Sequence, residues 1–332
     1  MSFALLNLPY VPRKHILKFM SFSDLIKFAK ISKRMKSAVK SLRHGFTFFR
    51  LFFSPEGLLH LAFIPYDKAV LTCFVPSLPG SPEQEIPGDS FQINYKEPTR
   101  ESRLEVFEQF LTECLELFLV KSIIVTFIES FDYENCFVWK FARYIIIMDI
   151  WHIHNKSPEI SSKTLLFGLE NPLVKGLTVR GRVETGFKYS KGLTTNLACH
   201  NVAKWLNFEA VLNMECNFFQ LEVTDHFSSQ QLNTFIKKWI SGDGLQLLKN
   251  FQMKTRRSKE REEVNEMLCE VLEGVRTEKW DVKLRDTHYN GLCENFSNGA
   301  YIWRNNGQRA AVFIRKGSIQ FYTRLPNPSF SH

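Results

Sequence analysis

Apolar residues near the start of the chain recur at spacings of three and four, as in amphipathic helices. Ile16, Leu17 and Met20 predict one short helix, which should begin near Pro12 because proline suits a first helical turn. A second helix is expected from the capping residue Ser21 onward. Its apolar face comprises Leu25, Phe28, Ala29, Ser32, Met35, Val39 and Leu42. About forty residues should therefore form a helical hairpin with one apolar side.

The next part of the chain changes to strand-like runs. Residues 46–53 and 58–63 predict two strands, because a Ser-Pro-Glu-Gly turn signal separates them. The proline-rich stretch 76–102 is expected to be a loop. An amphipathic helix is predicted over 104–119, followed by a buried strand at 123–127.

Strands and helices continue to alternate further along. Short strands are predicted at 177–179, 221–223 and 251–253. The helix between the last two should begin near Ser228 or Ser229 and stop at Gly242 or Gly244, and another spans 264–272. This alternation resembles irregular leucine-rich repeats that stack into a curved array. A conventional α/β domain gives the same coarse pattern, so the sequence leaves both open.

The last part of the chain predicts a three-stranded meander. Its strands are expected at 301–304, 309–314 and 319–322. Asn306 and Gly307 form the strongest hairpin-turn signal of the sequence, since both residue types tolerate positive φ. The expected fold class is thus mixed α+β or α/β: a small helical module, a larger domain of alternating strands and helices, and a closing β-meander.

Charge is distributed unevenly between these parts. The chain has 43 Lys and Arg, 34 Asp and Glu, and a net charge of +9. The first fifty residues hold eleven basic residues and a single acid, Asp24, for a net +10. The remaining residues hold 32 basic and 33 acidic side chains and are about neutral. The helical module should therefore attract an acidic protein or a polyanion.

The composition is that of a globular protein, with 44% hydrophobic residues and 31 phenylalanines to fill a core. Lys121 and Asp149 interrupt the two longest apolar runs, so neither reaches the roughly 18 residues that a membrane helix needs. Pro9 and Pro12 break the first apolar stretch, so we expect no secretory signal. The seven cysteines are scattered without a CxxC pair. We therefore expect reduced thiols and a location in the cytoplasm, the nucleus or both.

No known catalytic motif occurs in the sequence, so we expect no enzyme and no cofactor. The sequence Gly242-Asp243-Gly244 lacks a third glycine and follows a helix, which disfavours a phosphate site. His152 and His154 would share one face of a strand, but no further ligand lies at a suitable spacing, so no metal site is expected. The basic cluster at 254–261 runs into three glutamates and is read as a helix start.

The order of residues in the helical module resembles the F-box, over about residues 4–45. The residues that carry the resemblance are Leu8, Pro9, Ile16, Leu17, Met20, Ser23, Asp24, Leu25, Ala29, Ile31, Ser32, Lys33 and Met35. Met35 and Ser32 stand where many F-boxes have tryptophan and cysteine, which fits a nematode-expanded branch of the family. The resemblance implies binding to a Skp-type adaptor and, through it, to a cullin. The adaptor-facing positions would be Leu8, Pro9, Ile16, Leu17, Met20 and Leu25.

A second resemblance covers about residues 160–325. The segment 221–240 and the closing pattern 302–312 are similar to the F-box-associated domain type 2, although the Asn-Asn-Gly turn departs from the family's more charged turn. In that family the domain is thought to hold the target protein, and no residue-level site can be transferred.

Together these resemblances imply three regions: an F-box module at 4–45, a linking α/β segment at 46–160 and an F-box-associated domain at 161–325. The function they imply is a non-catalytic receptor of an SCF ubiquitin ligase, with an unidentified protein substrate and no membrane partner. The alternative is a nucleic-acid or anionic-surface binder that uses the basic module, although the module lacks an RNA-binding aromatic motif.

Overall fold

The computed structural model contains two compact units, Met1–Asp149 and Ile150–His332, which are described separately. The structure describes residues 8–42, 45–53, 59–65, 72–74, 100–128, 133–141, 143–151, 159–223, 227–254, 261–279, 299–315 and 318–323. His152 and His154, most of the proline-rich stretch 76–102 and most of the basic cluster 254–261 lie outside these residues.

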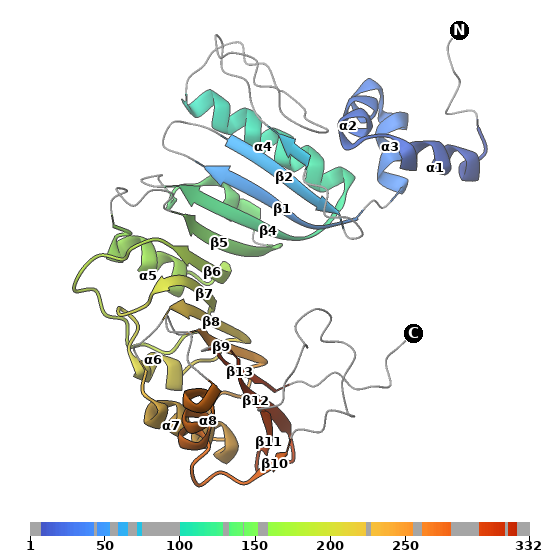
Figure 1. Ribbon diagram of the computed structural model, residues 1–332. Coiled ribbons are helices and arrows are strands. Elements are labelled where there is room, and N and C mark those ends of the chain that lie inside the picture. Colours follow the sequence, from blue (N-terminus) through green and yellow to red (C-terminus); the bar gives the residue numbers. More distant parts are fainter. Residues whose placement is uncertain are drawn as a thin grey trace. The chain divides into compact units, whose positions relative to one another are not determined.

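The helical module at the start of the first unit contains three helices, α1 (Tyr10–Phe19), α2 (Phe22–Ile31) and α3 (Lys33–Ser41) (Figure 1). The predicted hairpin of two helices is therefore wrong. Ser32 interrupts the second helix with an extended backbone (φ −162°), and its hydroxyl accepts a hydrogen bond from the Met35 amide at 3.2 Å. Serine is a preferred N-cap, so the interruption satisfies the amides that begin α3.

The starts of the first two helices depend on different residues. Helix α1 begins at Tyr10 after Pro9, two residues earlier than the predicted start at Pro12. Pro12 fits inside the first turn of α1, because amides there have no hydrogen-bond partner within the helix and proline lacks the amide hydrogen. Helix α2 follows Ser21, whose hydroxyl accepts from the Asp24 amide at 3.1 Å, so the predicted cap is confirmed.

A mixed sheet forms the rest of the first unit, in the order β5-β4-β1-β2-β3. Its strands are β1 (Gly45–Phe53), β2 (Leu59–Pro65), β3 (Thr72–Phe74), β4 (Leu119–Ile128) and β5 (Ile145–Trp151). The predicted hairpin of β1 and β2 is confirmed by their antiparallel pairing. Helix α4 (Arg100–Leu117) precedes β4, which pairs parallel with β1, so the predicted helix and strand are also confirmed.

The core of the first unit is an aromatic cluster where α4 packs over the sheet (Figure 1). The Phe53 ring of β1 lies 5.5 Å from Phe127 and 6.1 Å from Phe107, measured between centroids. Phe137, in the short helix η2 (Phe137–Phe141), lies 5.8 Å from Phe53 and 6.1 Å from Phe107. Four elements are thus joined by ring contacts, of which each adds about 0.5–1.5 kcal/mol beyond its buried area.

Four parallel strands begin the second unit, and they lie in the sheet in the order of the sequence. They are β6 (Val174–Arg180), β7 (Asn196–Val202), β8 (Phe218–Val223) and β9 (Asn250–Lys254). Strands β6, β7 and β8 begin 22 residues apart, at 174, 196 and 218, and β9 begins 32 residues later. Stacked strand–helix repeats produce strands in this sequential order. The spacing between the strands is unequal, however, so the interpretation as leucine-rich repeats stays a prediction.

The predicted meander is confirmed as antiparallel strands that continue this sheet beside β9. The strands are β13 (Ser318–Tyr322), β12 (Arg309–Arg315), β11 (Gly299–Trp303) and β10 (Thr277–Lys279). At the predicted Asn306-Gly307 turn, Gly307 alone has positive φ (84°). The Gly307 amide donates to Arg304 O at 2.9 Å, which closes a type I turn that ends in a left-handed glycine. The expected turn, in which both Asn306 and Gly307 would have positive φ, does not form.

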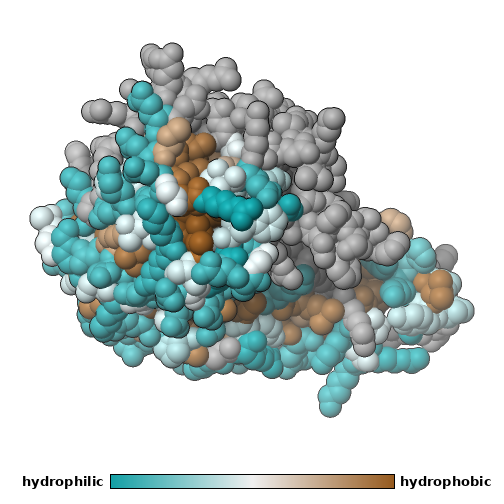
Figure 2. All heavy atoms as spheres, turned by 90° about the horizontal axis from the view of Figure 1, so that it is seen from below, coloured by the Kyte–Doolittle hydropathy of each residue, from teal (hydrophilic) through white to brown (hydrophobic). Residues whose placement is uncertain are grey.

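The helices of the second unit are α5 (Ser162–Glu170), α6 (Phe208–Leu212), α7 (Ser229–Ser241) and α8 (Arg261–Val271). Figure 1 shows α7 and α8 side by side along the strands. The helix predicted from Ser228 is confirmed, with a capping box between Ser228 and Gln231 and a left-handed Gly242 at its end. On the face drawn in Figure 2, hydrophobic residues form an elongated central patch and several smaller patches among hydrophilic residues.

Candidate functional site

The helical module has a small apolar core and several apolar side chains outside it. The buried residues are Leu17, Leu25, Ile26, Ala29, Ala38, Val39 and Leu42. Phe19, the last residue of α1, is 88% exposed, and Ile31, the last of α2, is 67% exposed. Phe19 and Ile31 therefore leave apolar surface of the module in contact with water.

The six predicted adaptor-facing residues divide into two groups. Pro9 and Ile16 are exposed, and Leu8 and Met20 are partly buried. Leu17 and Leu25 are instead 1% and 2% exposed, so in this structure they pack inside the module.

Sequence reasoning missed Phe19, although helical spacing could have found it. Pro12, Ile16 and Phe19 are separated by four and three residues, which places them on one face of α1. All three are exposed, and with Pro9 they form what we call the α1 face. The α1 face thus presents apolar side chains to solvent along the length of helix α1.

Part of the positive charge of the module is neutralised by helix α4 of the same unit. Lys36 donates to Glu116 at 2.6 Å, and Lys30 lies 3.2 Å from Glu113. The hydrogen bond from Lys36 lowers the pKa of the Glu116 carboxyl, and the bond to Glu116 raises the pKa of Lys36. All four side chains remain about half exposed, so each pair contributes at most about 1 kcal/mol. Ion pairs of this strength hold the module beside α4 only weakly.

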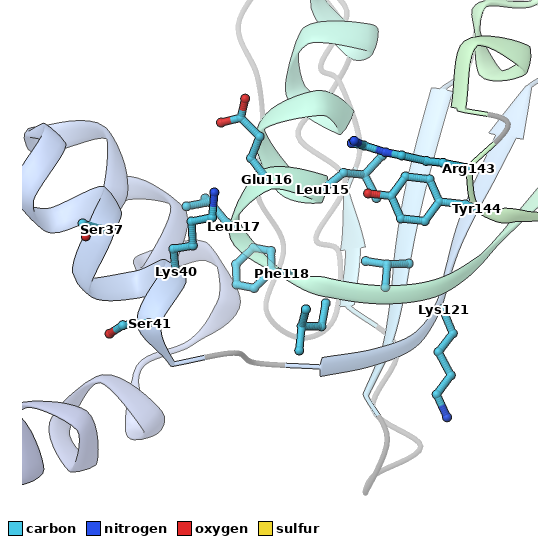
Figure 3. A pocket seen from close by; sticks show the side chains of 12 residues that line it. Ser37, Lys40, Ser41, Leu115, Glu116, Leu117, Phe118, Lys121, Arg143 and Tyr144 are labelled. Atoms are coloured by element: carbon cyan, nitrogen blue, oxygen red, sulfur yellow. The ribbon is translucent and has the colours of Figure 1, made fainter.

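A groove lies on the other side of these pairs, between α3 and the start of β4 (Figure 3). Its volume is about 780 Å³. Its residues are Ser37, Lys40, Ser41, Leu115, Glu116, Leu117, Phe118, Leu119, Val120, Lys121, Arg143 and Tyr144. No pattern in the sequence indicated this groove, because α3 and Arg143, which line it together, lie more than a hundred residues apart in the chain.

In the second unit, helix α7 organises the core. Its buried side chains are Leu232, Phe235, Ile236 and Trp239. The Phe235 ring lies 4.5 Å from Phe251 of β9, and Trp239 lies 5.1 Å from Phe321 of β13 in an edge-to-face arrangement. Segment 221–240 and the meander, which carried separate parts of the second resemblance, therefore belong to one core.

The hairpin turn of the meander is also bonded to the end of α7. The Arg304 guanidinium donates to Gly244 O at 2.9 Å and lies 5.6 Å from the centre of the Trp239 ring. The Asn305 amide donates to Ile240 O at 3.0 Å, which satisfies one of the last helical carbonyls. These contacts make the turn a structural part of the domain.

Chemical groups in the described residues do not form a recognisable reactive centre. No cluster of three or more His, Cys, Asp and Glu that could hold a metal occurs in the described part of the chain. Burial raises the pKa of the Cys114 thiol, and raises that of Cys216 to about 12, so both stay protonated at neutral pH. Within the described ranges, no helix is both long and apolar enough to span a membrane.

One buried ion pair was not anticipated from the sequence. Asp149 of β5 is 1% exposed, and its Oδ2 accepts from Arg50 of β1 at 2.9 Å. The hydroxyl of Thr126 lies 3.5 Å from the same oxygen. The sequence suggested only that Asp149 interrupts an apolar run. Together with Thr126, the pair connects β1, β4 and β5, and removal of Arg50 would leave a costly unpaired charge on the buried Asp149.

Comparisons with known proteins identify two regions of the chain. Residues 5–47 match the F-box domain, and residues 189–253 match the F-box associated domain FBA_2. No curated protein and no solved structure matches the chain. Both domains are typical of non-enzymatic adaptor proteins. The nematode branch and the wider span 161–325 stay predictions. The chain therefore combines a region that matches the F-box domain with a region that matches the FBA_2 F-box-associated domain.

Proposed function

We propose that this protein is a substrate-recognition subunit of an SCF-type ubiquitin ligase. The F-box module would bind a Skp-type adaptor, which links it to a cullin, and the remainder would hold a target protein. The ubiquitin transfer itself would be done by a partnered conjugating enzyme. This chain would contribute proximity, since holding the target and the activated ubiquitin in one assembly makes their encounter effectively intramolecular.

The observation that carries the proposal is the exposed α1 face in a region that matches the F-box. Burial of a Phe19-sized side chain in an interface contributes about 1.5–3 kcal/mol. Pro9, Ile16 and Met20 would add to the same contact, together with Leu8. Leu17 and Leu25 would support the contact from inside the module.

The charge of the module supports an acidic partner. Lys18 is exposed near the end of α1, and Lys33 and Arg34 are exposed at the start of α3. Cations at the rim of an apolar contact raise the association rate with an acidic adaptor and favour one orientation.

The test uses the full chain and co-purification with a Skp-type adaptor. The variant Ile16→Asp/Phe19→Asp places two carboxylates in the α1 face, and we expect adaptor affinity to fall by about a hundredfold or more. The melting temperature should stay within about 2 °C, because both side chains are already exposed.

Leu247→Asp is the matched control, since Leu247 is an exposed leucine of the second unit. It should retain full adaptor binding. Unchanged adaptor affinity in the double variant would refute the proposed contact. A single-stranded oligonucleotide that binds the full chain at low salt more tightly than the adaptor does would favour the nucleic-acid alternative instead.

A further inference from the structure

The groove between α3 and β4 is walled by positive side chains from three elements. Lys40 comes from α3, Lys121 from β4, and Arg143 from the turn that precedes β5. In Figure 3, Lys40 and Arg143 stand at opposite walls, and Lys121 extends from the strand in another direction. A chain lying along this groove would therefore meet a cation at several points.

Glu116 is the one acidic residue among the described residues that line the groove. Its carboxylate already accepts a 2.6 Å hydrogen bond from Lys36, which lies outside the groove lining. The charge of Glu116 is thus largely compensated by Lys36. The electrostatic potential of the groove is left positive, since Lys40 and Arg143 at its two walls face a single carboxylate that Lys36 also neutralises.

The groove also offers apolar contact. Leu117 and Phe118 are each 4% exposed and form part of its floor. Leu119, the first residue of β4, is 55% exposed, and Tyr144 is partly buried at the other wall. An exposed leucine beside a positively charged groove suits a ligand that has both apolar and acidic side chains.

We propose that this groove binds an acidic segment of the target protein, in which carboxylates flank an apolar anchor residue. The apolar anchor would cover Leu119, and the carboxylates would pair with Lys40 and Arg143. This proposal rests on the proposed receptor function and adds the chemical class of the segment that the receptor recognises.

The adaptor is a poorer candidate for the same groove. Ile16, Phe19 and Ile31, the exposed apolar residues that suit the adaptor, do not line it. The residues of the module that do line it are Ser37, Lys40 and Ser41, all on α3. An adaptor bound to the α1 face would therefore leave the groove available for a second protein.

The test measures fluorescence anisotropy of labelled peptides with the full chain. One peptide has a leucine flanked by glutamates, and a second has the same length with glutamines in their place. We expect the acidic peptide to bind at least about tenfold more tightly, with an affinity that falls as salt rises. Equal affinities for the two peptides would overturn the proposal.

Variants of the groove test the charges directly. Lys40→Gln/Arg143→Gln should weaken the acidic peptide by about tenfold. Lys40→Glu/Arg143→Glu should reverse the preference toward a peptide with lysines around the leucine. Lys237→Glu is the matched control, because Lys237 is an exposed helical lysine of the second unit, and it should change nothing. An equal loss in this control would mean nonspecific attraction and would overturn the proposal.

Saturating adaptor separates this proposal from the receptor function. If the groove serves the target, adaptor should leave peptide affinity unchanged, and Ile16→Asp/Phe19→Asp should lose adaptor but retain the peptide. Displacement of the peptide by adaptor would assign the groove to the adaptor and overturn the proposal. Retained adaptor binding in that double variant would instead count against the α1 face as the adaptor contact and would leave the groove proposal standing.

Discussion

The helical module and the second unit stabilise themselves in different ways. The module buries aliphatic side chains from three short helices, and it leaves the aromatic ring of Phe19 88% exposed to solvent. The second unit buries its large aromatic residues, among them Trp239 and Phe235, between α7 and the sheet. The module thus retains apolar surface that a partner can cover, whereas the second unit uses its aromatic residues for its own core.

The same contrast appears in how each region is attached to its neighbours. Exposed ion pairs such as Lys36–Glu116 join the module to α4. The groove described above and a smaller pocket lie beside these pairs. In the second unit, buried rings and the Arg304 hydrogen bond join the meander to α7. The ion pairs beside the module are thus open to solvent, whereas the contacts that join the meander to α7 are buried.

The largest effect should come from removing the ring at the centre of the second unit. Trp239→Ala deletes a fully buried side chain that contacts Phe321 and supports Arg304. We expect the free energy of unfolding to fall by about 3–5 kcal/mol, measured by urea denaturation. Leu247→Ala, at an exposed position, should change it by less than about 0.5 kcal/mol. A loss below about 1 kcal/mol for Trp239→Ala would contradict the aromatic-core description.

An intermediate effect is expected inside the module. Leu17→Ala removes a buried side chain of α1, and we expect about 2–3 kcal/mol of lost stability confined to α1, α2 and α3. Hydrogen exchange should show faster exchange of those amides while α7 remains protected. Phe19→Ala is the control, because its exposed ring contributes little to folding. Similar losses in both variants would remove the distinction between core and binding residues.

The sequence predicted the elements where one local signal sufficed. The apolar period of α7 and the Ser228 cap placed that helix closely, and the turn signals placed the β1–β2 hairpin and the meander. Strand β7 was missed because polar residues such as Asn196 and His200 interrupt its apolar pattern. The sequence did not predict the end of α2 at Ser32, because the helical spacing of apolar residues continues through this position. The role of Ser32 as the N-cap of α3 is visible only in its extended backbone and its hydrogen bond.

The candidate site was harder to predict, because burial depends on tertiary packing. Ile16 and Leu17 are both apolar residues of the predicted first helix, yet Ile16 is exposed and Leu17 is buried. The groove and the Arg50–Asp149 pair join residues about a hundred positions apart, which no local pattern encodes. The sequence therefore identified the helical module that matches the F-box domain, but not which of its apolar side chains are exposed.

The smallest effect concerns the ion pair that joins the module to α4. Lys36→Met removes the hydrogen bond that lowers the pKa of Glu116, so that pKa should rise toward its ordinary value of 4.5. A carboxyl ¹³C NMR titration measures the change, and Lys237→Met should leave it unaltered. Because the folded pKa of Glu116 is lowered, its stabilising contribution is present above the ordinary pKa and is lost as pH falls through the lowered one.

The paired lysine sets the upper end of the same pH window. The pKa of Lys36 is raised above 10.5, so its contribution is complete below that value and is lost as pH rises through the raised pKa. Both groups are largely exposed, so the pair should contribute less than about 1 kcal/mol and weaken further with salt. An unchanged pKa of Glu116 in Lys36→Met would mean that the pair does not form in solution. The module would then be held beside α4 by apolar contacts, and the contrast with the second unit would narrow.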